Sequence, residues 1–262
     1  MRLATWNVNS LKVRLPQVLN WLKLHRPDVL CLQETKLEDA NFPVQDIQAA
    51  GYQVLCSGQK TYNGVAILSR VAASDALTAI PAFDDPQKRV LAANIGSLRV
   101  FCLYVPNGES VDSDKYRYKL QWLAAVTAWL KRELAVNPRL VVLGDFNIAP
   151  EARDVHDSEA WEGRVLFSAP ERKAFQDLIE IGLKDAFRLF DQPERSFTWW
   201  DYRMNAFKRK LGLRIDHVLV GDNLGTACRA CTIDVEPRKS ERPSDHAPVW
   251  ADLEIQPLPT AG

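Results

Sequence analysis

The sequence predicts an α/β or α+β domain in which helices are layered against mixed β-sheets. Short apolar runs of strand length recur along the 262 residues, and amphipathic helical stretches lie between them. At least one pair of runs is joined by a two-residue turn, which makes two neighbouring strands antiparallel. No low-complexity linker divides the chain, so we expect one domain over residues 1–256 and a flexible tail over residues 257–262.

Eight runs are predicted as strands because they are short and either rich in β-branched residues or alternating in polarity. In chain order they are RLATW (2–6), VLCLQ (29–33), GVAILS (64–69), RVLAANI (89–95), LRVFCLYV (98–105), LVVLGD (140–145), DHVLVG (216–221) and APVWADLEI (247–255). Gly96 and Ser97 alone separate the fourth run from the fifth, which is typical of a β-hairpin.

Three stretches have the spacing of amphipathic helices. RLPQVLNWLKLHRP (14–27) places Val18 and Leu22 on one face and ends at Pro27. YKLQWLAAVTAWLKRELAV (118–136) carries an apolar stripe along its whole length. ERKAFQDLIEIGL (171–183) is a third helix, which is expected to end at Gly182.

The composition excludes some classes of protein. No apolar run approaches the roughly 18 residues that span a bilayer, and the N-terminus lacks the apolar core of a secretory signal. The formal net charge is zero, so any nucleic-acid-binding surface must be local. Cys31 and Cys102 lie inside apolar runs and are expected in the core, while the single CRAC motif at 228–231 has no second pair to hold zinc. Scattered cysteines of this kind indicate a reducing, cytoplasmic compartment.

Polar residues follow several of the apolar runs at the point where each predicted strand ends. Asn7 follows the first run and Glu34 the second, while Asp145 and Asn147 occupy the end of the run at 140–145. Residues two apart point to the same side of an extended chain, so Asp145 and Asn147 are expected to face one point. A rigid scaffold commonly presents a functional site in this way.

These side chains form an oxygen-rich set. Together with Asp245, they offer carboxylate and amide oxygens, which hard cations such as Mg²⁺ and Mn²⁺ prefer. A carboxylate beside an amide also fits water activation, in which the carboxylate takes the proton and the amide holds the phosphate or the water. His246 could hydrogen-bond a phosphoryl oxygen or relay a proton, and Asp216 is a candidate carboxylate partner for it. Any one of these residues alone could be a solvated strand end, but the whole set predicts phosphate hydrolysis.

Basic residues gather in local runs. A charge run often does no more than solvate a surface, but beside a phosphate-hydrolysing centre it fits the phosphates of DNA. The candidates are Arg203, Lys208, Arg209, Lys210 and Arg214 in the segment 203–214, Lys115, Arg117 and Lys119 in KYRYK, and Lys12, Arg14 and Lys36 beside the first two polar clusters.

Seven motifs, in order, resemble those of the exonuclease III type of abasic-site (AP) endonuclease, within the endonuclease/exonuclease/phosphatase superfamily. They are TWNVNSLKVRL, LQETK, YNGVAILSR, YVPNGE, LGDFNIAP, GLRIDHVLV and RPSDHAPV. GDFN and SDH also occur in DNase I-like nucleases and lipid phosphatases, but the full series is specific to the DNA-repair branch. The resemblance implies a DNase I-like, four-layered α/β sandwich of two mixed sheets flanked by helices, with the site between the tops of the sheets.

The resemblance also implies roles for individual residues. Glu34 matches the family's metal-binding Glu, which Asn7 assists. Asp145 matches the Asp that orients or deprotonates the attacking water or protonates the leaving oxygen, Asn147 matches its partner, and Tyr104 matches the active-site Tyr.

The last two motifs supply the remaining roles. Asp245 matches an Asp near the metal, His246 contacts the scissile phosphate, and Asp216 orients this histidine. His217 occupies a position where the family does not require histidine, so it is expected to be structural. The implied metal set is Asn7, Glu34, Asp145, Asn147, Asp245 and His246.

Two departures from the eukaryotic pattern affect the expected site. An Asp of that pattern is replaced by Asn9, which puts a metal role for this residue in doubt. A Trp and a Leu that help to hold the flipped-out abasic sugar are replaced by Leu213 and Ile215. These two residues, with Trp199 or Trp200, are expected to form the sugar pocket, as in bacterial-type members.

The implied activity is cleavage of double-stranded DNA 5′ to abasic sites, leaving a 3′-OH, with Mg²⁺ or Mn²⁺ as cofactor and with 3′→5′ exonuclease and 3′-end-cleaning activity. The alternative is a mainly 3′-directed exonuclease or phosphatase with weak AP endonuclease activity. KYRYK and GLRID disfavour a lipid or inositol phosphatase, and the full catalytic set disfavours an inactive DNA-binding protein. We expect a monomer that acts on DNA with abasic sites or blocked 3′ ends.

Overall fold

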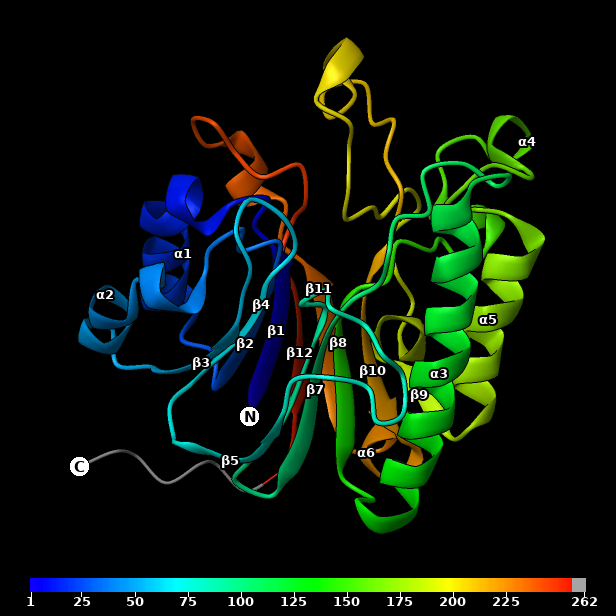
Figure 1. The fold of residues 1–262 in the computed structure, drawn as a ribbon. Coiled ribbons are helices and arrows are strands. Elements are labelled where there is room, and N and C mark those ends of the chain that lie inside the picture. The colour runs from blue at the N-terminus through cyan, green and yellow to red at the C-terminus, as the bar shows by residue number, and fades with distance from the viewer. Residues whose placement is uncertain (256–262) are drawn as a thin grey trace.

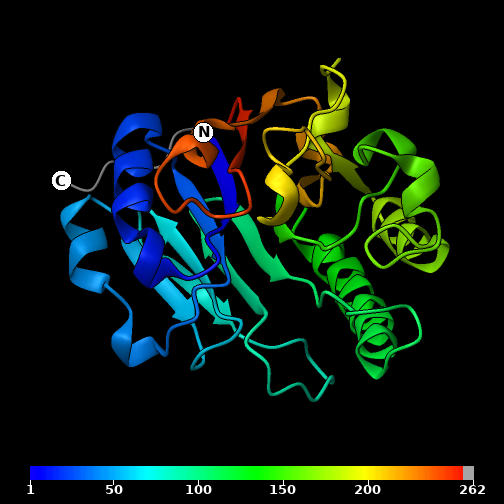
Figure 2. The same cartoon turned by 90° about the horizontal axis from the view of Figure 1, so that it is seen from above.

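A computed structural model of the protein describes residues 1–255, so the predicted tail at 257–262 lies outside the described residues. Two six-stranded β-sheets pack face to face, and helices cover the outer face of each (Figure 1). The view from above shows the same succession of helices, two sheets and helices (Figure 2). The predicted four-layered sandwich is therefore confirmed.

The first sheet has the strand order β11-β12-β1-β2-β4-β3. Its strands β1 and β2 are parallel, and its other neighbours are antiparallel. Helices α1 (Leu11–His25) and α2 (Val44–Ala49) pack on its outer face (Figure 1). The strands are β1 (Arg2–Asn7), β2 (Val29–Gln33), β3 (Gln53–Ser57), β4 (Val65–Ser69), β11 (Cys228–Ile233) and β12 (Val249–Leu253).

The second sheet has the order β5-β6-β7-β8-β10-β9, with β7 and β8 parallel. Helices α3 (Asp114–Val136) and α5 (Ala169–Glu180) cover it (Figure 1). Ile95 lies opposite Leu98, which confirms the predicted hairpin. The strands are β5 (Ala73–Leu77), β6 (Val90–Ile95), β7 (Leu98–Tyr104), β8 (Leu140–Asp145), β9 (Leu183–Asp185) and β10 (Asp216–Gly221).

Short helices complete the chain. They are α4 (Ser158–Trp161), α6 (Asp222–Gly225) and the 3₁₀ turns η1 (Asp39–Asn41), η2 (Ala152–Asp154), η3 (Ala186–Leu189), η4 (Arg203–Asn205) and η5 (Glu236–Lys239). None of the helices within residues 1–255 combines the length and apolar character needed to cross a membrane.

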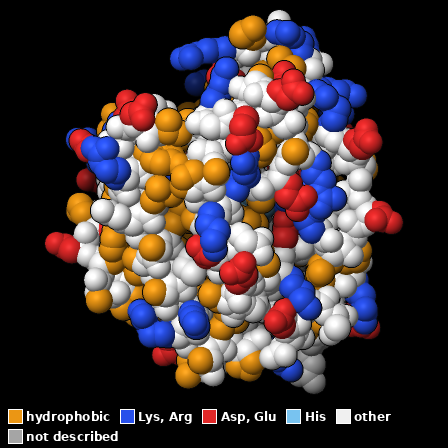
Figure 3. Space-filling view, turned by 90° about the vertical axis from the view of Figure 1, so that its right-hand side faces the viewer, with side chains coloured by type: hydrophobic (Ala, Val, Ile, Leu, Met, Phe, Trp, Pro, Cys, Tyr) orange, Lys and Arg blue, Asp and Glu red, His pale blue; other side chains and the backbone are white. Residues whose placement is uncertain are grey.

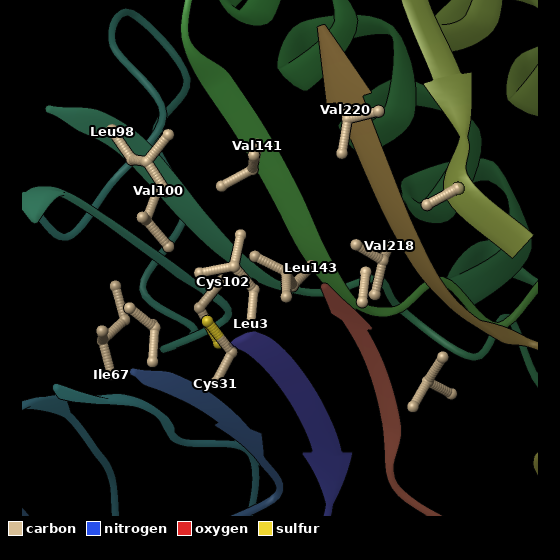
Figure 4. Close-up of a cluster of buried hydrophobic side chains, with 14 of the residues drawn as sticks. Leu3, Cys31, Ile67, Leu98, Val100, Cys102, Val141, Leu143, Val218 and Val220 are labelled. Carbon is tan, nitrogen blue, oxygen red and sulfur yellow. The ribbon is translucent and has the colours of Figure 1, made fainter. Parts of the chain in front are cut away.

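The inner core lies between the two sheets. Alternate residues of the facing strands interdigitate there, among them Leu3, Val141 and Val218 (Figure 4). Cys31 and Cys102 are buried in this layer, as the sequence predicted (Figure 4). Because the opposite side of each sheet also packs against helices, the central strands are apolar on both faces and are held rigidly.

Capping residues set the starts of two helices earlier than the apolar pattern predicted. Helix α3 begins at Asp114 rather than at residue 118, because the Ser113 hydroxyl accepts a hydrogen bond from the Tyr116 amide at 3.1 Å. Helix α5 begins at Ala169 rather than at residue 171, and Ser168 and Glu171 form a capping box at its start. Residues 114–117 therefore form a first helical turn of α3 that the apolar pattern did not predict.

Residues 201–211 project from the end of the sandwich at which β1 and β8 finish, and we call them the basic segment (yellow in Figure 1). Arg203, Lys208, Arg209 and Lys210 are exposed on it. Lys and Arg side chains also gather at this end of the molecule in the space-filling view (Figure 3).

Candidate active site

Strands of the two sheets bring the candidate site residues to one edge of the sandwich. On the second sheet, Tyr104 of β7 and Asp216 of β10 both lie opposite Asp145 of β8 in the strand register. Since β10 is antiparallel to β8, its first residue meets the last residue of β8. Glycine at position 144 allows β7 and β8 to pair in this register, because a Cβ there would lie 2.0 Å from the carbonyl oxygen of Leu103. On the first sheet, Asn7 ends β1 and Glu34 follows β2.

One amide joins the carboxylates of the two sheets. Nδ2 of Asn7 donates to Glu34 Oε1 at 2.9 Å and to Asp145 Oδ2 at 2.9 Å. The Asn7 side-chain oxygen accepts from the Asn9 amide at 2.9 Å, so it faces away from the carboxylates. Asn7 was predicted to assist the metal, and its contacts show that it bridges the carboxylates of Glu34 and Asp145.

Asp145 and Asn147 converge as predicted, but through a turn after β8 and not through the extended backbone on which that prediction rested. The backbone amide of Asn147 donates to Asp145 Oδ1 at 2.9 Å, and its Nδ2 donates to Asp145 Oδ2 at 3.3 Å and to the Val105 carbonyl at 3.0 Å. Asn147 has a left-handed backbone with φ 49°, which turns its side chain back toward the end of β8. Asn107 donates to the Asn147 side-chain oxygen at 3.1 Å. YVPNGE contains this asparagine, which follows the end of a predicted strand but was assigned no role from the sequence.

His246 lies between two buried aspartates. Its Nδ1 is 2.8 Å from Asp216 Oδ2, and its Nε2 is 3.8 Å from Asp145 Oδ2. Burial alone would lower the pKa of His246, but the negative charges of Asp216 and Asp145 outweigh burial and raise this pKa to about 10. The imidazole is therefore positively charged at neutral pH, and its Nδ1–H donates to Asp216.

Burial has the opposite effect on the acidic and phenolic groups. It raises the pKa of Asp145 to about 7, although the charge of His246 and the hydrogen bonds from Asn7 and Asn147 oppose this rise. Burial also raises the pKa of the Tyr104 hydroxyl, and the charges of Glu34 and Asp145 raise it further. Tyr104 is therefore neutral and retains a proton to donate.

One atom from each of Glu34, Asp145 and His246 lies within 4.8 Å of the others. The two carboxylates could hold a metal ion, whereas His246 in its charged form has no free nitrogen lone pair to offer it. The donor set fits a hard divalent cation, because a buried carboxylate with a raised pKa gains most from a nearby positive charge. Asp245 points elsewhere: its oxygens accept from Asn9 Nδ2 at 2.9 Å and from Trp199 Nε1 at 3.0 Å.

These two hydrogen bonds have an electrostatic effect. Burial would raise the pKa of Asp245, but the charge of His246 and the bonds from Asn9 and Trp199 outweigh burial and lower it. Asn9 therefore contributes through Asp245, a role that the sequence did not predict.

Only part of the predicted sugar pocket faces the site. Trp199 contacts Asp245, whereas Trp200 is buried in a separate cluster with Phe197 and Ala206. Leu213 and Ile215 are 0% and 1% exposed. Of the two tryptophans between which the sequence left the choice open, Trp199 is thus the one at the site and Trp200 the buried one, and Leu213 and Ile215 lie beneath the surface instead of lining open space. The alternating pattern of GLRID could not reveal this, because a pocket floor and a packed core have the same apolar signal.

Two of the predicted DNA contacts are wrong. Lys119 is 0% exposed and pairs with the equally buried Glu171, because it lies on the inner face of α3. Arg214 is 1% exposed and pairs with Asp154 and Asp185. His217 is structural, as predicted: it is buried beside Arg214, with its Nε2 2.9 Å from the Ile148 carbonyl.

The remaining basic residues divide into two groups. Lys36 lies at the site, with its Nζ 2.9 Å from Glu34 Oε2, and Arg14 donates to the carbonyls of Asn9, Arg242 and Pro243. The others are exposed, although two of them have acidic neighbours on the surface. They are Lys12, Lys115 (paired with Glu109), Arg117 (paired with Asp114), Arg203, Lys208, Arg209 and Lys210.

We expect the basic segment to act through phosphates. Changing Lys208, Arg209 and Lys210 to Ala should weaken binding to damaged and intact duplex alike, and should make the slope of log K against log salt shallower by up to about 0.9 per lost phosphate contact. Fluorescence anisotropy at several salt concentrations would measure this. As a matched control, Lys131, Arg132 and Arg139 are exposed at the opposite end of the second sheet. An unchanged slope in the first variant would show that the segment is only a solvated surface.

The chain is similar to known nucleases and phosphatases along almost its whole length. Exodeoxyribonuclease III from Haemophilus influenzae is 34% identical over 266 residues, which cover 97% of this chain and 100% of that protein. A solved 3′ phosphatase from Neisseria, bound to product DNA hairpin, is 48% identical with a TM-score of 0.96, covering 97% of this chain and 100% of that one. An AP endonuclease from Archaeoglobus fulgidus is 38% identical with a TM-score of 0.94 and the same coverage.

The resemblance carried by the seven motifs is thus confirmed along the chain. The match to the family model extends over residues 4–246, from β1 through the histidine that faces Asp145 and Asp216. With its fold, its site edge and its full-length relatives in agreement, the chain belongs to the Endonuclease/Exonuclease/phosphatase family.

Proposed function

We propose that the protein is a divalent-metal-dependent DNA-repair hydrolase that cleaves the phosphodiester 5′ to abasic sites, leaving a 3′-OH, and that also removes nucleotides or phosphate from 3′ ends. The observation that carries the proposal is the buried Asp145, held by Asn7 and Asn147 and facing the charged His246 beside Glu34. This arrangement is suited to hydrolysing a phosphate ester. The exposed basic segment at the same end suits a polyanionic substrate such as double-stranded DNA.

The side chains divide the chemistry between them. Asp145, in its ionised form, is placed to take a proton from the attacking water, with Asn147 fixing its orientation. The positive charge of His246 and the hydroxyl of Tyr104 are suited to binding phosphoryl oxygens, where negative charge develops. A Mg²⁺ or Mn²⁺ ion held by Glu34 and Asp145 would polarise the phosphate as a Lewis acid.

A second candidate, mainly 3′-directed hydrolysis with weak AP endonuclease activity, is favoured by one observation. The apolar side chains expected to receive a flipped-out sugar, Leu213 and Ile215, are covered. A 3′ end presents its phosphate without extrusion of a nucleotide, so it needs less space at this point. The 3′ phosphatase activity of the Neisseria relative agrees with this candidate.

A gel assay would distinguish the two candidate functions. End-labelled duplexes would carry one abasic-site analogue, a 3′-phosphate at a nick, or no lesion. The first proposal expects incision 5′ to the analogue with the highest kcat/KM, and the second expects the 3′-phosphate to be removed fastest. Hydrolysis of none of the three substrates in the presence of Mg²⁺ or Mn²⁺ would refute the DNA-repair assignment.

We also propose that the protein acts as a monomer in the cytoplasm. Sedimentation of the free protein would test the first point, and fractionation of cells would test the second.

Metal dependence has its own test at Glu34. We expect EDTA to abolish activity and Mg²⁺ or Mn²⁺ to restore it, and Glu34→Ala to raise the metal concentration for half-maximal activity about 10-fold or more. Glu38→Ala is the matched control, because this nearby carboxylate is exposed and outside the cluster. A Glu34→Ala enzyme with an unchanged metal titration would remove Glu34 from the ligands.

A further inference from the structure

A buried ammonium group lies directly behind the site. Lys119 of α3 is 0% exposed, and its Nζ donates to the Asn147 carbonyl at 2.6 Å and to the Asn107 carbonyl at 3.1 Å. Its third contact is an ion pair with Glu171 of α5, which is also fully buried. The Lys119 ammonium group thus contacts the loop after β7, the loop after β8 and the start of α5.

The two carbonyls belong to residues that hold the reacting carboxylate. Asn107 donates to the side chain of Asn147, and Asn147 donates twice to Asp145. Lys119 therefore contacts the main chain of the same two residues whose side chains lead to Asp145. A contact placed elsewhere on these loops could stabilise the fold without affecting that orientation.

The backbone of both loops is unusual where the ammonium group binds. Asn147 has φ 49°, and Gly108 has φ 97°. A Cβ on Gly108 would lie 3.2 Å from Lys119 Cδ, so the first loop is packed closely around the lysine side chain. Left-handed residues other than glycine persist where surrounding contacts hold them, and a cation bound to the carbonyl of Asn147 provides such a contact.

Glu171 anchors the lysine to rigid structure. Its Oε1 accepts from the Leu166 amide at 3.0 Å, and its Oε2 accepts from the Ser168 amide at 3.0 Å and the Ser168 hydroxyl at 2.5 Å. The Ser168 hydroxyl is also 2.5 Å from the Tyr116 hydroxyl of α3. The ammonium group is therefore fixed by two packed helices, and it transfers their rigidity to the loops.

Stability alone is a weak reason for such a pair. Well-packed apolar side chains can replace a buried ion pair with little or no loss of stability, because burial of the charges offsets most of their attraction. Burial lowers the pKa of Lys119, while the charges of Glu171 and Asp145 favour its protonated form. A methionine pair would fill the space but would bind neither carbonyl.

We propose that Lys119 is a positioning residue for phosphoester hydrolysis, whose ammonium group holds Asn107 and Asn147 so that Asn147 keeps Asp145 in its reactive orientation. This inference rests on the proposed function, and it concerns the rate of the chemical step instead of DNA binding. Lys119 is 0% exposed and its ammonium group is bound to the Asn107 and Asn147 carbonyls and to Glu171, so it acts through these residues and not by contact with a substrate.

Three variants test the proposal. Lys119→Met removes the ammonium group but leaves the Glu171 charge unpaired, so it should lose thermal stability. Lys119→Met combined with Glu171→Gln leaves no unpaired buried charge, so it should regain much of that stability. Arg99→Met is the matched control: Arg99 is buried, pairs with Glu133 of the same helix and binds the Asp75 carbonyl, but it lies at the opposite end of the sheet.

The expected result separates rate from folding. At temperatures well below each Tm, both Lys119 variants should show kcat lowered by about 10²-fold, the scale for a catalytic group misplaced by about 1 Å, with KM for DNA nearly unchanged. Arg99→Met should lose stability while keeping its kcat. Where Lys119→Met is too unstable to purify, the double variant carries the comparison.

Two outcomes would overturn the inference. One is a double variant whose kcat recovers together with its Tm, and the other is a Lys119→Met enzyme with normal kcat; either would show that Lys119 is only structural. A wild-type protein that hydrolyses none of the three DNA substrates would refute the proposed function instead, so the two failures are distinguishable.

Discussion

Asp145→Asn is expected to lower kcat by roughly 10²-fold or more, the scale of general acid–base catalysis. The substitution keeps the shape of the side chain but removes the oxygen that can take a proton from water. The hydrogen bonds from Asn7 and from the Asn147 backbone both end on Asp145 carboxylate oxygens, so an amide can keep only part of this network. DNA affinity should hold or improve, because one negative charge near the phosphate is removed.

Single-turnover rates and binding in EDTA would measure the two effects separately. Asp191→Asn is the control, since this carboxylate is exposed and lies on a surface loop. Near-normal turnover by Asp145→Asn would show that another group activates the water. Tight DNA binding with lost turnover would support the assigned role.

The pKa shifts also predict how stability depends on pH in the metal-free protein. The pKa of Asp145 is raised to about 7 in the fold, so its contribution to stability is present below the unfolded value and is lost as pH rises through 7. The pKa of His246 is raised to about 10, so its contribution is likewise lost as pH rises through 10. Asp145→Asn should therefore flatten the lower part of the Tm against pH curve in EDTA, and an equally steep curve would contradict the shift.

The sequence predicted every central strand and missed every edge strand. Strands β3, β5, β9 and β11 stand at the four edges of the two sheets. An edge strand has one neighbour and a face open to solvent, so it needs no continuous apolar run; β5, for example, is almost wholly exposed. Central strands such as β8, which is buried along its entire length, give the strong signal that was used.

The strong signal of the buried strands also decided which site residues could be predicted. Glu34, Asp145 and His246 were identifiable because acidic and imidazole groups directly follow or precede buried strands, where few structural roles exist for them. Lys119 and Arg214 were misassigned because a charged residue normally lies on the surface, and their acidic partners Glu171 and Asp154 are far away in sequence. Only the packing of α3 against α5 brings the first pair together.

The pocket residues show a further limit. GLRID and TWWDY supply apolar and aromatic side chains, but their sequence does not determine which of two adjacent tryptophans turns toward the site. The structure makes the choice through hydrogen bonding: the Trp199 indole donates to Asp245, while Trp200 packs with Phe197. Whether a sugar can enter depends on the position of loops, which no local pattern encodes.

Asp216→Asn should have an effect comparable to that of Asp145→Asn, although Asp216 lies behind the histidine. The Nδ1–H of His246 donates to Asp216 Oδ2 at 2.8 Å, and Asp216 is the strongest of the charges that raise the pKa of His246. Asparagine at position 216 removes this charge, so the protonated, positively charged form of His246 is less favoured. We expect kcat to fall by roughly 10²- to 10⁴-fold, as when a group that supports general acid–base chemistry is lost.

The pH dependence of the residual activity gives the sharper test of Asp216. In the wild type His246 stays protonated until pH approaches its pKa of about 10, so the histidine should not limit the rate on the alkaline side before that point. In Asp216→Asn the pKa of His246 should be lower, and the protonated form, with the activity that needs it, should disappear at a lower pH. Profiles of kcat between about pH 6 and pH 10 would show this shift, with Asp222→Asn, an exposed carboxylate just beyond the other end of β10, as the control. An alkaline limb that does not move, together with a normal Tm, would mean that Asp216 acts by holding the ring in place and not by keeping it charged.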